Sequence, residues 1–168
     1  MKALKLFPLF CFFSLVFYSC KKTDISSNNT DAGSGTSTVN KILLLQLVND
    51  SRQKGCTCGS TYMPPVPAVN WNDQLTTAAD VHSKDMLQNN YFSHTGADGS
   101  SPGDRIRQAG YNWRAYGENI AKGYQDEQSV MTAWLQSEDH CKNIMGKDFT
   151  EMGVARAGSY WTQEFGTK

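Results

Sequence analysis

The stretch MGVARAGSYWTQEF (152–165) contains two short runs of strand-forming residues on either side of Gly158-Ser159. A Gly-Ser pair between two such runs is typical of a tight β-hairpin turn. The stretch therefore predicts two antiparallel strands, at 152–157 and 160–165. One further short strand is expected earlier in the chain, at 118–121.

The residues before this hairpin show helical periodicity instead. Asn72 is a favourable N-cap, and Ser101-Pro102 is a favourable helix start because proline suits the first helical turn. Apolar spacing and these start signals predict four helices, at 39–54, from Asn72 to about Asn90, from Ser101 to Gly110, and from Asp126 to about Ser137. Helices combined with a small antiparallel sheet indicate an α+β sandwich.

The first twenty residues are typical of a secretory leader. Lys2 and Lys5 form a positive start, and residues 6–18 are almost entirely apolar. This run is shorter than the roughly 20 apolar residues that a membrane span needs. The stretch FYSC (17–20) resembles the lipobox of bacterial lipoproteins, in which the cysteine becomes the acylated first residue. We therefore expect an exported protein of the cell envelope, anchored to a membrane by lipid on Cys20. The alternative is an ordinary cleaved signal peptide and a secreted protein.

A polar segment follows this leader. Residues 21–38 are rich in Ser, Thr, Asn, Asp and Gly, a composition that cannot bury a core. The expected organisation is a leader at 1–20, a flexible linker at 21–38 and one folded domain at 39–168. Without residues 1–19, which carry two lysines and no acid, the 16 basic side chains become 14 against 16 acidic ones, a net charge of −2. Phosphate binding would require a basic excess, so no nucleic-acid partner is expected.

Three cysteines fall in the predicted domain: Cys56, Cys58 and Cys141. Outside the cytoplasm one disulfide is expected. Because Cys56 and Cys58 are close together in the sequence, Cys141 is the expected partner of one of them. The sequence does not decide between the two. A Cys-x-Cys metal site is the alternative, although no fourth soft ligand lies nearby in the sequence.

The chain has only three histidines. His82 lies on the apolar face of the helix predicted after Asn72, as expected for a buried histidine. His94 follows the end of that helix, His140 closes another predicted helix, and Glu118 begins a predicted strand. If these element ends converge on one cleft, two neutral imidazoles and a carboxylate would suit zinc. The alternative is two surface histidines and an unrelated acid, because the chain has no His-Glu-x-x-His or Gly-x-Ser-x-Gly motif.

Five sequence blocks occur in a fixed order along the chain. They are YFSHTG (91–96), GENIA (117–121), WLQSEDHCKNI (134–144), EMGV (151–154) and YWTQEFG (160–166). In this order they resemble the CAP superfamily, also called SCP/TAPS, which includes cysteine-rich secretory, antigen-five and pathogenesis-related proteins. The resemblance covers about residues 41–166. It implies an α-β-α sandwich with a central three-stranded antiparallel sheet, in agreement with the α+β prediction.

The resemblance also implies a cleft with two histidines and two acidic residues, which binds a divalent metal in several members of the family. By motif, His94 matches the first histidine, His140 the second, and Glu118 the acid of Gly-Glu-Asn. The second family glutamate has no clear match, because the segment after Trp134 is short and Glu138-Asp139 replaces the usual Pro-Gly of bacterial relatives. Glu138 is therefore either a further ligand or a residue that caps a helix end.

Three functions fit these observations. The first is a ligand-binding or interaction module, and the second is a metal-dependent, peptidase-like hydrolase with Glu118 as candidate base. The third is a lipid or sterol carrier, as reported for some eukaryotic relatives. The sequence shows no oxyanion donor, no complete catalytic constellation and no large apolar groove. We therefore expect an interaction module for an unidentified small-molecule, lipid or protein ligand, with zinc as the expected metal.

Overall fold

The computed structural model describes residues 38–168, so the predicted leader, Cys20 and the linker up to residue 37 lie outside the described residues. The elements are α1 (Lys41–Lys54), β1 (Cys56–Cys58), β2 (Thr61–Met63), β3 (Asn70–Trp71), α2 (Asp73–Gln88), α3 (Pro102–Gln108), β4 (Ala115–Lys122), α4 (Glu127–Gln136), α5 (Glu138–Ile144), β5 (Glu151–Ala157) and β6 (Tyr160–Thr167). Among residues 38–168, no helix combines the length and the apolar character that a membrane crossing requires.

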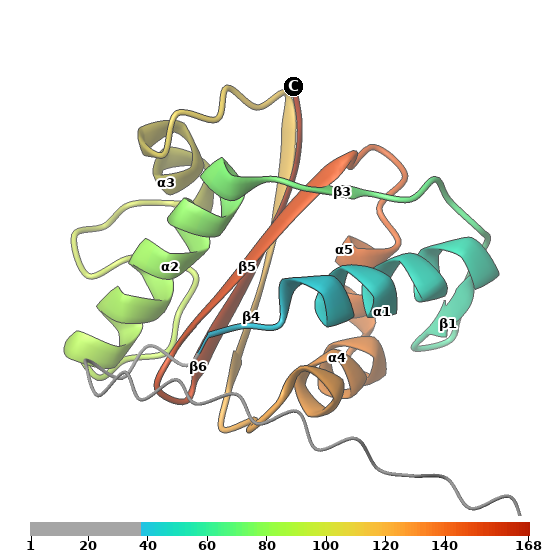
Figure 1. Ribbon diagram of the computed structural model, residues 1–168, viewed down its shortest axis with the longest axis horizontal. Coiled ribbons are helices and arrows are strands. Elements are labelled where there is room, and N and C mark those ends of the chain that lie inside the picture. Colours follow the sequence, from blue (N-terminus) through green and yellow to red (C-terminus); the bar gives the residue numbers. More distant parts are fainter. Residues whose placement is uncertain (1–37) are drawn as a thin grey trace, which may run out of the picture. The chain divides into compact units, whose positions relative to one another are not determined.

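The main sheet has the strand order β3-β5-β6-β4, which leaves β3 and β4 at its edges (Figure 1). β6 pairs antiparallel with both β5 and β4, and the turn at Gly158-Ser159 joins β5 to β6. The predicted hairpin and the α+β class are confirmed. β3 pairs parallel with β5 over two residues only, too short a strand for the sequence to show a periodicity.

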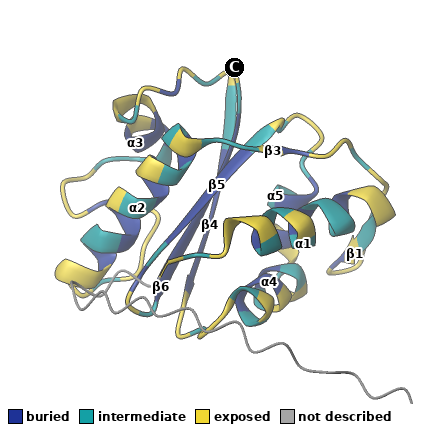
Figure 2. Ribbon diagram, viewed as in Figure 1, coloured by how far each residue is buried: buried dark blue, intermediate teal, exposed yellow. Residues whose placement is uncertain are grey.

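Helices cover both faces of this sheet: α2 and α3 lie on one side, and α1, α4 and α5 on the other (Figure 1). The strands between them are mostly buried, whereas the helices expose their outer faces (Figure 2). One core cluster joins Val48 of α1 and Trp134 of α4 to Trp161 of β6. A second cluster joins Leu75 of α2 to Ile106 of α3. A third cluster joins Met86 of α2 to Ile120 of β4, so each helical layer has its own apolar contact with the sheet.

The helix caps are largely those that the sequence predicts. The Asn72 side chain accepts hydrogen bonds from the backbone N–H groups of Gln74 and Leu75. Ser101 forms a capping box with Asp104 at the start of α3. These contacts satisfy N–H groups that a helix start otherwise leaves without partners.

Two local predictions are wrong. No strand is predicted between residues 54 and 72, yet this segment contains the antiparallel pair β1–β2. His140 does not close a helix but lies inside the separate helix α5. Ser137 ends α4 because its backbone is extended, with ψ at 126°, and a new helix begins at the next residue. The helix end at about Ser137 is as predicted, but the separate helix α5 that follows it is not, and no glycine or proline separates the two helices.

Candidate functional site

Glu118 lies at the centre of the candidate site, on the edge strand β4. Both of its carboxylate oxygens have partners: Oε1 lies 2.6 Å from Nδ1 of His94, and Oε2 accepts a hydrogen bond of 2.6 Å from Nη2 of Arg105. Its side chain is only 2% exposed. Burial by itself would raise the pKa of Glu118, but the hydrogen bond from His94 and the charge of Arg105 lower the pKa below its ordinary value. Glu118 is therefore an ionised, buried carboxylate.

Arg105 holds the loop that carries His94. From α3, Nη2 of Arg105 also donates to the backbone oxygen of His94, and Nη1 donates to that of Ser100, each at 2.9 Å. Asp85 of α2 supports the same loop, because it accepts hydrogen bonds from the Tyr91 hydroxyl and the Ala97 backbone. The loop between α2 and α3 is thus fixed at several points by charged groups.

Two further titratable side chains lie next to Glu118 in the protein interior. Glu164 of β6 is opposite Glu118 in the antiparallel register and is fully buried. Burial and the negative charge of Glu118 raise the pKa of Glu164 well above its ordinary value, which favours the protonated form of Glu164. His82 of α2 is also fully buried, and its Nε2 donates to the backbone oxygen of Ser93 at 2.9 Å. Burial lowers the pKa of His82 and keeps its ring neutral. The predicted buried role of His82 is confirmed.

His94 is the part of this cluster that reaches solvent. Its side chain is 52% exposed although Nδ1 contacts the buried Glu118. An ionised carboxylate only accepts hydrogen bonds, so Nδ1 of His94 must carry the proton. In the neutral ring, Nε2 then keeps its lone pair and is available to a metal or to a hydrogen-bond donor.

His140 approaches from the other side of the β4 edge. The Asn119 side chain donates to the backbone oxygen of His140 at 3.2 Å, and Asn143 of α5 donates to the backbone oxygen of Glu118 at 3.0 Å. Burial lowers the pKa of the His140 ring, and the positive charge that His94 can carry lowers it further. The two predicted histidines are therefore electrostatic neighbours, but only His94 contacts Glu118.

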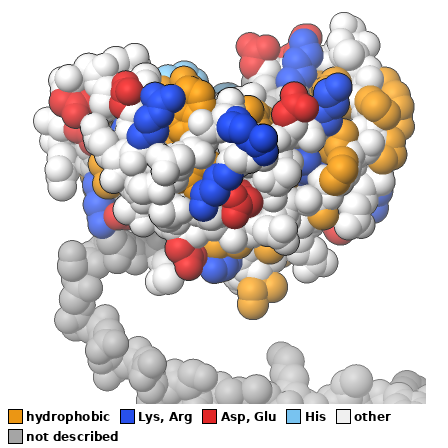
Figure 3. Space-filling model, turned by 90° about the horizontal axis from the view of Figure 1, so that it is seen from above, with side chains coloured by type: hydrophobic (Ala, Val, Ile, Leu, Met, Phe, Trp, Pro, Cys, Tyr) orange, Lys and Arg blue, Asp and Glu red, His pale blue; other side chains and the backbone are white. Residues whose placement is uncertain are grey.

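A cavity of about 290 Å³ lies beside His140. Its lining includes Phe92 from the loop before α3, Tyr124, and Trp134 of α4. On the face seen in Figure 3, histidine reaches the surface at one margin next to hydrophobic side chains, while acidic and basic side chains are intermixed elsewhere. The histidine edge of the domain thus combines imidazole groups with apolar surface.

The fourth predicted member, Glu138, lies elsewhere in the structure. Its carboxylate accepts a hydrogen bond of 2.6 Å from Nζ of Lys142, one turn further along α5. It also packs close to Gly59, in the turn between β1 and β2. Glu138 is therefore engaged with its own helix and with the β1–β2 turn.

The described residues contain one group of three close metal-type donors, and it is the cysteine cluster. The sulfur atoms of Cys56, Cys58 and Cys141 lie within 4.8 Å of one another. A disulfide joins Cys58 to Cys141, which gives the pairing that the sequence left open. Because this bond uses two of the three sulfurs, the oxidised cluster offers a metal only the Cys56 thiol.

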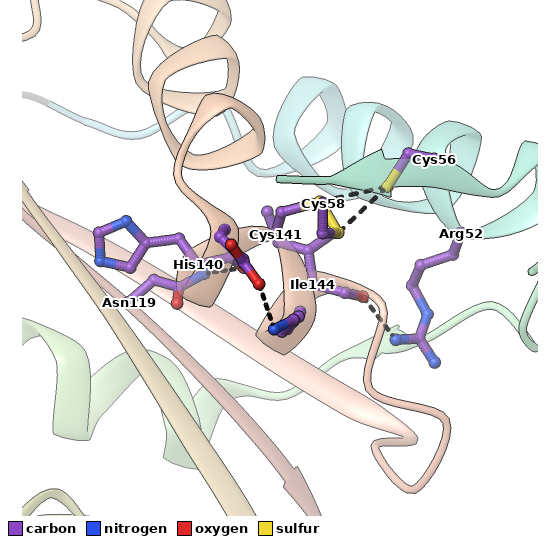
Figure 4. The surroundings of a disulfide bond; sticks show 9 residues. Arg52, Cys56, Cys58, Asn119, His140, Cys141 and Ile144 are labelled. Atoms are coloured by element: carbon purple, nitrogen blue, oxygen red, sulfur yellow. Dashed lines mark hydrogen bonds and ion pairs between the residues drawn. A yellow bond between two sulfur atoms is a disulfide. The ribbon is translucent and has the colours of Figure 1, made fainter. Parts of the chain in front are cut away.

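Arg52 of α1 anchors the end of α5 near this disulfide (Figure 4). It is fully buried, and its guanidinium donates to four backbone oxygens, those of Pro67, Ile144, Gly146 and Phe149. Burial lowers its pKa to about 10, which leaves it charged at neutral pH. The helix that carries His140 is thus held by a disulfide and by a buried cation.

The comparisons with known proteins agree with this geometry. The family model described as "CAP: Cysteine-rich secretory protein family" matches residues 45–165. The chain belongs to the CAP family. The CAP domain is 34% identical over 142 residues to the protein YkwD of Bacillus subtilis (strain 168), which covers 83% of this chain and 51% of YkwD. It is 37% identical over 97 residues to the membrane protein YlbC of the same organism, covering 58% of this chain and 28% of YlbC. The chain thus spans about half of YkwD and a smaller share of YlbC.

Solved structures give the same fold. An extracellular protein containing an SCP domain, from Bacillus anthracis str. Ames, matches with a TM-score of 0.66 and 33% identity over 76% of this chain and 40% of that chain. An outer surface protein from Borrelia burgdorferi matches with a TM-score of 0.64, covering 76% of this chain and 91% of that chain. Its identity is 20%, so this second match supports the fold alone.

Sequence reasoning missed two members of the CAP site. Arg105 sits in a short predicted helix with no motif around it, and Glu164 lies in a strand of otherwise ordinary hairpin residues. The available signal for Glu164 was an acid between Gln163 and Phe165 in a predicted strand. Buried acids require a special partner or a bound proton.

Proposed function

We propose that this CAP domain is an exported ligand-binding module whose recognition surface is the edge of β4, where His94 and His140 are presented. The observation that supports this proposal is the contact of 2.6 Å between His94 Nδ1 and Glu118 Oε1. About half of the His94 side chain nevertheless remains exposed to solvent. A buried carboxylate thereby fixes the orientation and tautomer of a solvent-facing imidazole. Such pre-organisation favours binding because little freedom is lost when the ligand arrives.

A divalent metal, with zinc as the favoured ion, is part of this proposal. His94 and His140 would hold it through neutral imidazole nitrogens, and burial supports the neutral state of His140. Glu118 has both oxygens engaged, so we assign it to the orientation of His94 rather than to the metal itself. Remaining coordination positions would be filled by water or by the ligand. When bound, zinc would supply Lewis acidity toward an anionic or carbonyl-containing ligand.

The hydrolase alternative has less support. A general base must be free to accept a proton from the attacking water. Glu118 is 2% exposed and paired with both His94 and Arg105, so it is not free in this arrangement. The carrier alternative needs room for a long apolar chain. The cavity beside His140, at about 290 Å³, lies at the lower limit of ligand pockets.

Zinc titration by calorimetry near neutral pH tests the metal. The titration should be run on the Cys56→Ser protein, so that the free thiol does not contribute. We expect His94→Ala and His140→Ala each to abolish binding, because two imidazoles would supply the protein ligands. Glu118→Gln should weaken binding about 10- to 100-fold, as is typical when a residue supporting a ligand is lost.

Glu138→Gln is the matched control, since it removes an acid from the same helix as His140 but away from the β4 edge. It should bind zinc like the parent. Retained binding in both histidine variants would place the metal elsewhere. A folded parent that binds no zinc would contradict the metal part of the proposal.

Export and lipid anchoring complete the proposal. Support comes from the leader with Cys20 at its end, and from the 33% identical relative, which is described as extracellular. Cys20→Ala should move the protein out of the membrane fraction, whereas Cys11→Ala should leave it there. An unchanged distribution of the Cys20 variant would leave only the cleaved-signal interpretation.

A further inference from the structure

The three cysteines of the domain meet where β1 touches α5. Cys56 and Cys58 are two residues apart in a strand, so their side chains project from the same face. Both point toward Cys141 of α5 (Figure 4). Cys58 and Cys141 form the disulfide, and Cys56 remains a free, half-buried thiol. A nucleophile and a disulfide are thus packed together.

The distances favour one of two exchange reactions. The sulfur of Cys56 lies 3.3 Å from that of Cys141 and 3.7 Å from that of Cys58. Attack on Cys58 would form a disulfide within one strand, between residues whose Cα atoms are about 6.6 Å apart by strand geometry, near the upper limit for a disulfide. Attack on Cys141 joins two separate elements and starts from the shorter contact, after the Cys56 side chain rotates so that its sulfur lies in line with the bond between Cys141 and Cys58. Cys141 is therefore the favoured target.

We propose that Cys56, Cys58 and Cys141 form a thiol–disulfide exchange site in which Cys56 replaces Cys58 as the partner of Cys141. The Cys56 thiol loses its proton to solvent, and the resulting thiolate forms a bond to Cys141 Sγ. The bond between Cys58 and Cys141 breaks, and Cys58 leaves as a thiolate that takes a proton from solvent. One disulfide and one thiol are present before and after, so no oxidant or reductant is consumed.

The exchange changes which thiol the surroundings can reach. Cys56 is partly exposed, whereas Cys58 is fully buried. One isomer therefore presents a thiol to solvent and the other hides it. β1 stays linked to α5 in both isomers, so the helix that carries His140 remains tethered. Burial raises the pKa of the Cys56 thiol, which limits the thiolate and slows exchange near neutral pH.

Mapping the free thiol tests the proposal in the full chain. The protein is held at pH 8, quenched in acid, denatured and treated with N-ethylmaleimide, which marks whichever cysteine is unpaired. Cys56 and Cys58 lie in one tryptic peptide, 55–84, so fragment ions must assign the label. We expect label on Cys56 and also on Cys58, with the Cys58 share at about 1% or more, in the range of a minor state in a two-state exchange.

Two variants make the result decisive. Cys56→Ser removes the attacking thiol, so Cys58 should carry no label, and this control also reports any exchange driven by Cys11 or Cys20. Cys58→Ser should still show peptide 55–84 linked to peptide 123–142, now through Cys56. Label confined to Cys56 in the parent would overturn the proposal. So would a Cys58→Ser protein in which Cys56 and Cys141 are both alkylated.

Discussion

Arg105→Met removes the cation that stabilises Glu118 in the interior of the CAP domain. The hydrogen bond of 2.6 Å between them places the two charge centres about 4 Å apart, where attraction amounts to about 4 kcal/mol at an effective dielectric constant of about 20. Both groups are buried, so the variant leaves a carboxylate without its main counter-charge. We expect a loss of about 3–5 kcal/mol in the free energy of unfolding.

The double variant Arg105→Met/Glu118→Gln carries the decisive information. It removes both charges together, so it should lose less than the sum of the two single variants by at least about 2 kcal/mol. Urea unfolding followed by circular dichroism gives the four free energies, with the disulfide kept oxidised. Losses that add within about 0.5 kcal/mol would refute the view that this pair is a coupled, buried unit.

Three further predictions concern the surroundings of the site. Gly153→Ala should lower the free energy of unfolding in urea by about 1–3 kcal/mol, because a Cβ there would meet the backbone of Leu75 at 2.6 Å. An unchanged unfolding midpoint would contradict this close packing of β5 against α2. Glu164→Gln should gain stability relative to the parent as pH rises above about 4.5, by at most about 1.4 kcal/mol per pH unit. The reason is that the folded parent keeps a proton that its unfolded chain releases; a constant difference between pH 4 and 7 would show that the pKa of Glu164 is not raised. Arg52→Met should lower the free energy of unfolding by about 4 kcal/mol, roughly 1 kcal/mol for each of its four carbonyl acceptors. The control Arg107→Met, at an exposed arginine, should lower it by at most about 1 kcal/mol. Equal losses in the two variants would contradict the anchoring role of Arg52.

The hairpin and the helix starts could be predicted because their signals are local. Gly158-Ser159, Asn72 and Ser101 each act on neighbouring residues, and the structure confirms the element that each one predicts. β3 and the separate helix α5 could not be predicted in the same way. They depend on pairing with β5 and on packing of α5, which are tertiary effects without a local pattern.

The candidate site was predictable only in part. Motif order indicated His94 and Glu118, and the structure brings these two together. The roles of Arg105 and Glu164 depend on which residues face each other across α3, β4 and β6, and a single sequence does not give that register directly. The assignment of Glu138 as a ligand stays a prediction, and the structure shows its carboxylate engaged by Lys142, one helical turn away.

The position of β4 at the edge of the sheet has a consequence for solubility. Edge strands carry unpaired backbone groups that can template pairing with another molecule. Here Asn143 occupies the outward backbone oxygen of Glu118 and also contacts the Asn119 side chain. The amide that closes this edge therefore also fixes the strand segment that carries the site carboxylate. The protection of this strand edge and the placement of Glu118 thus depend on the same side chain, and a substitution at Asn143 would disturb both together.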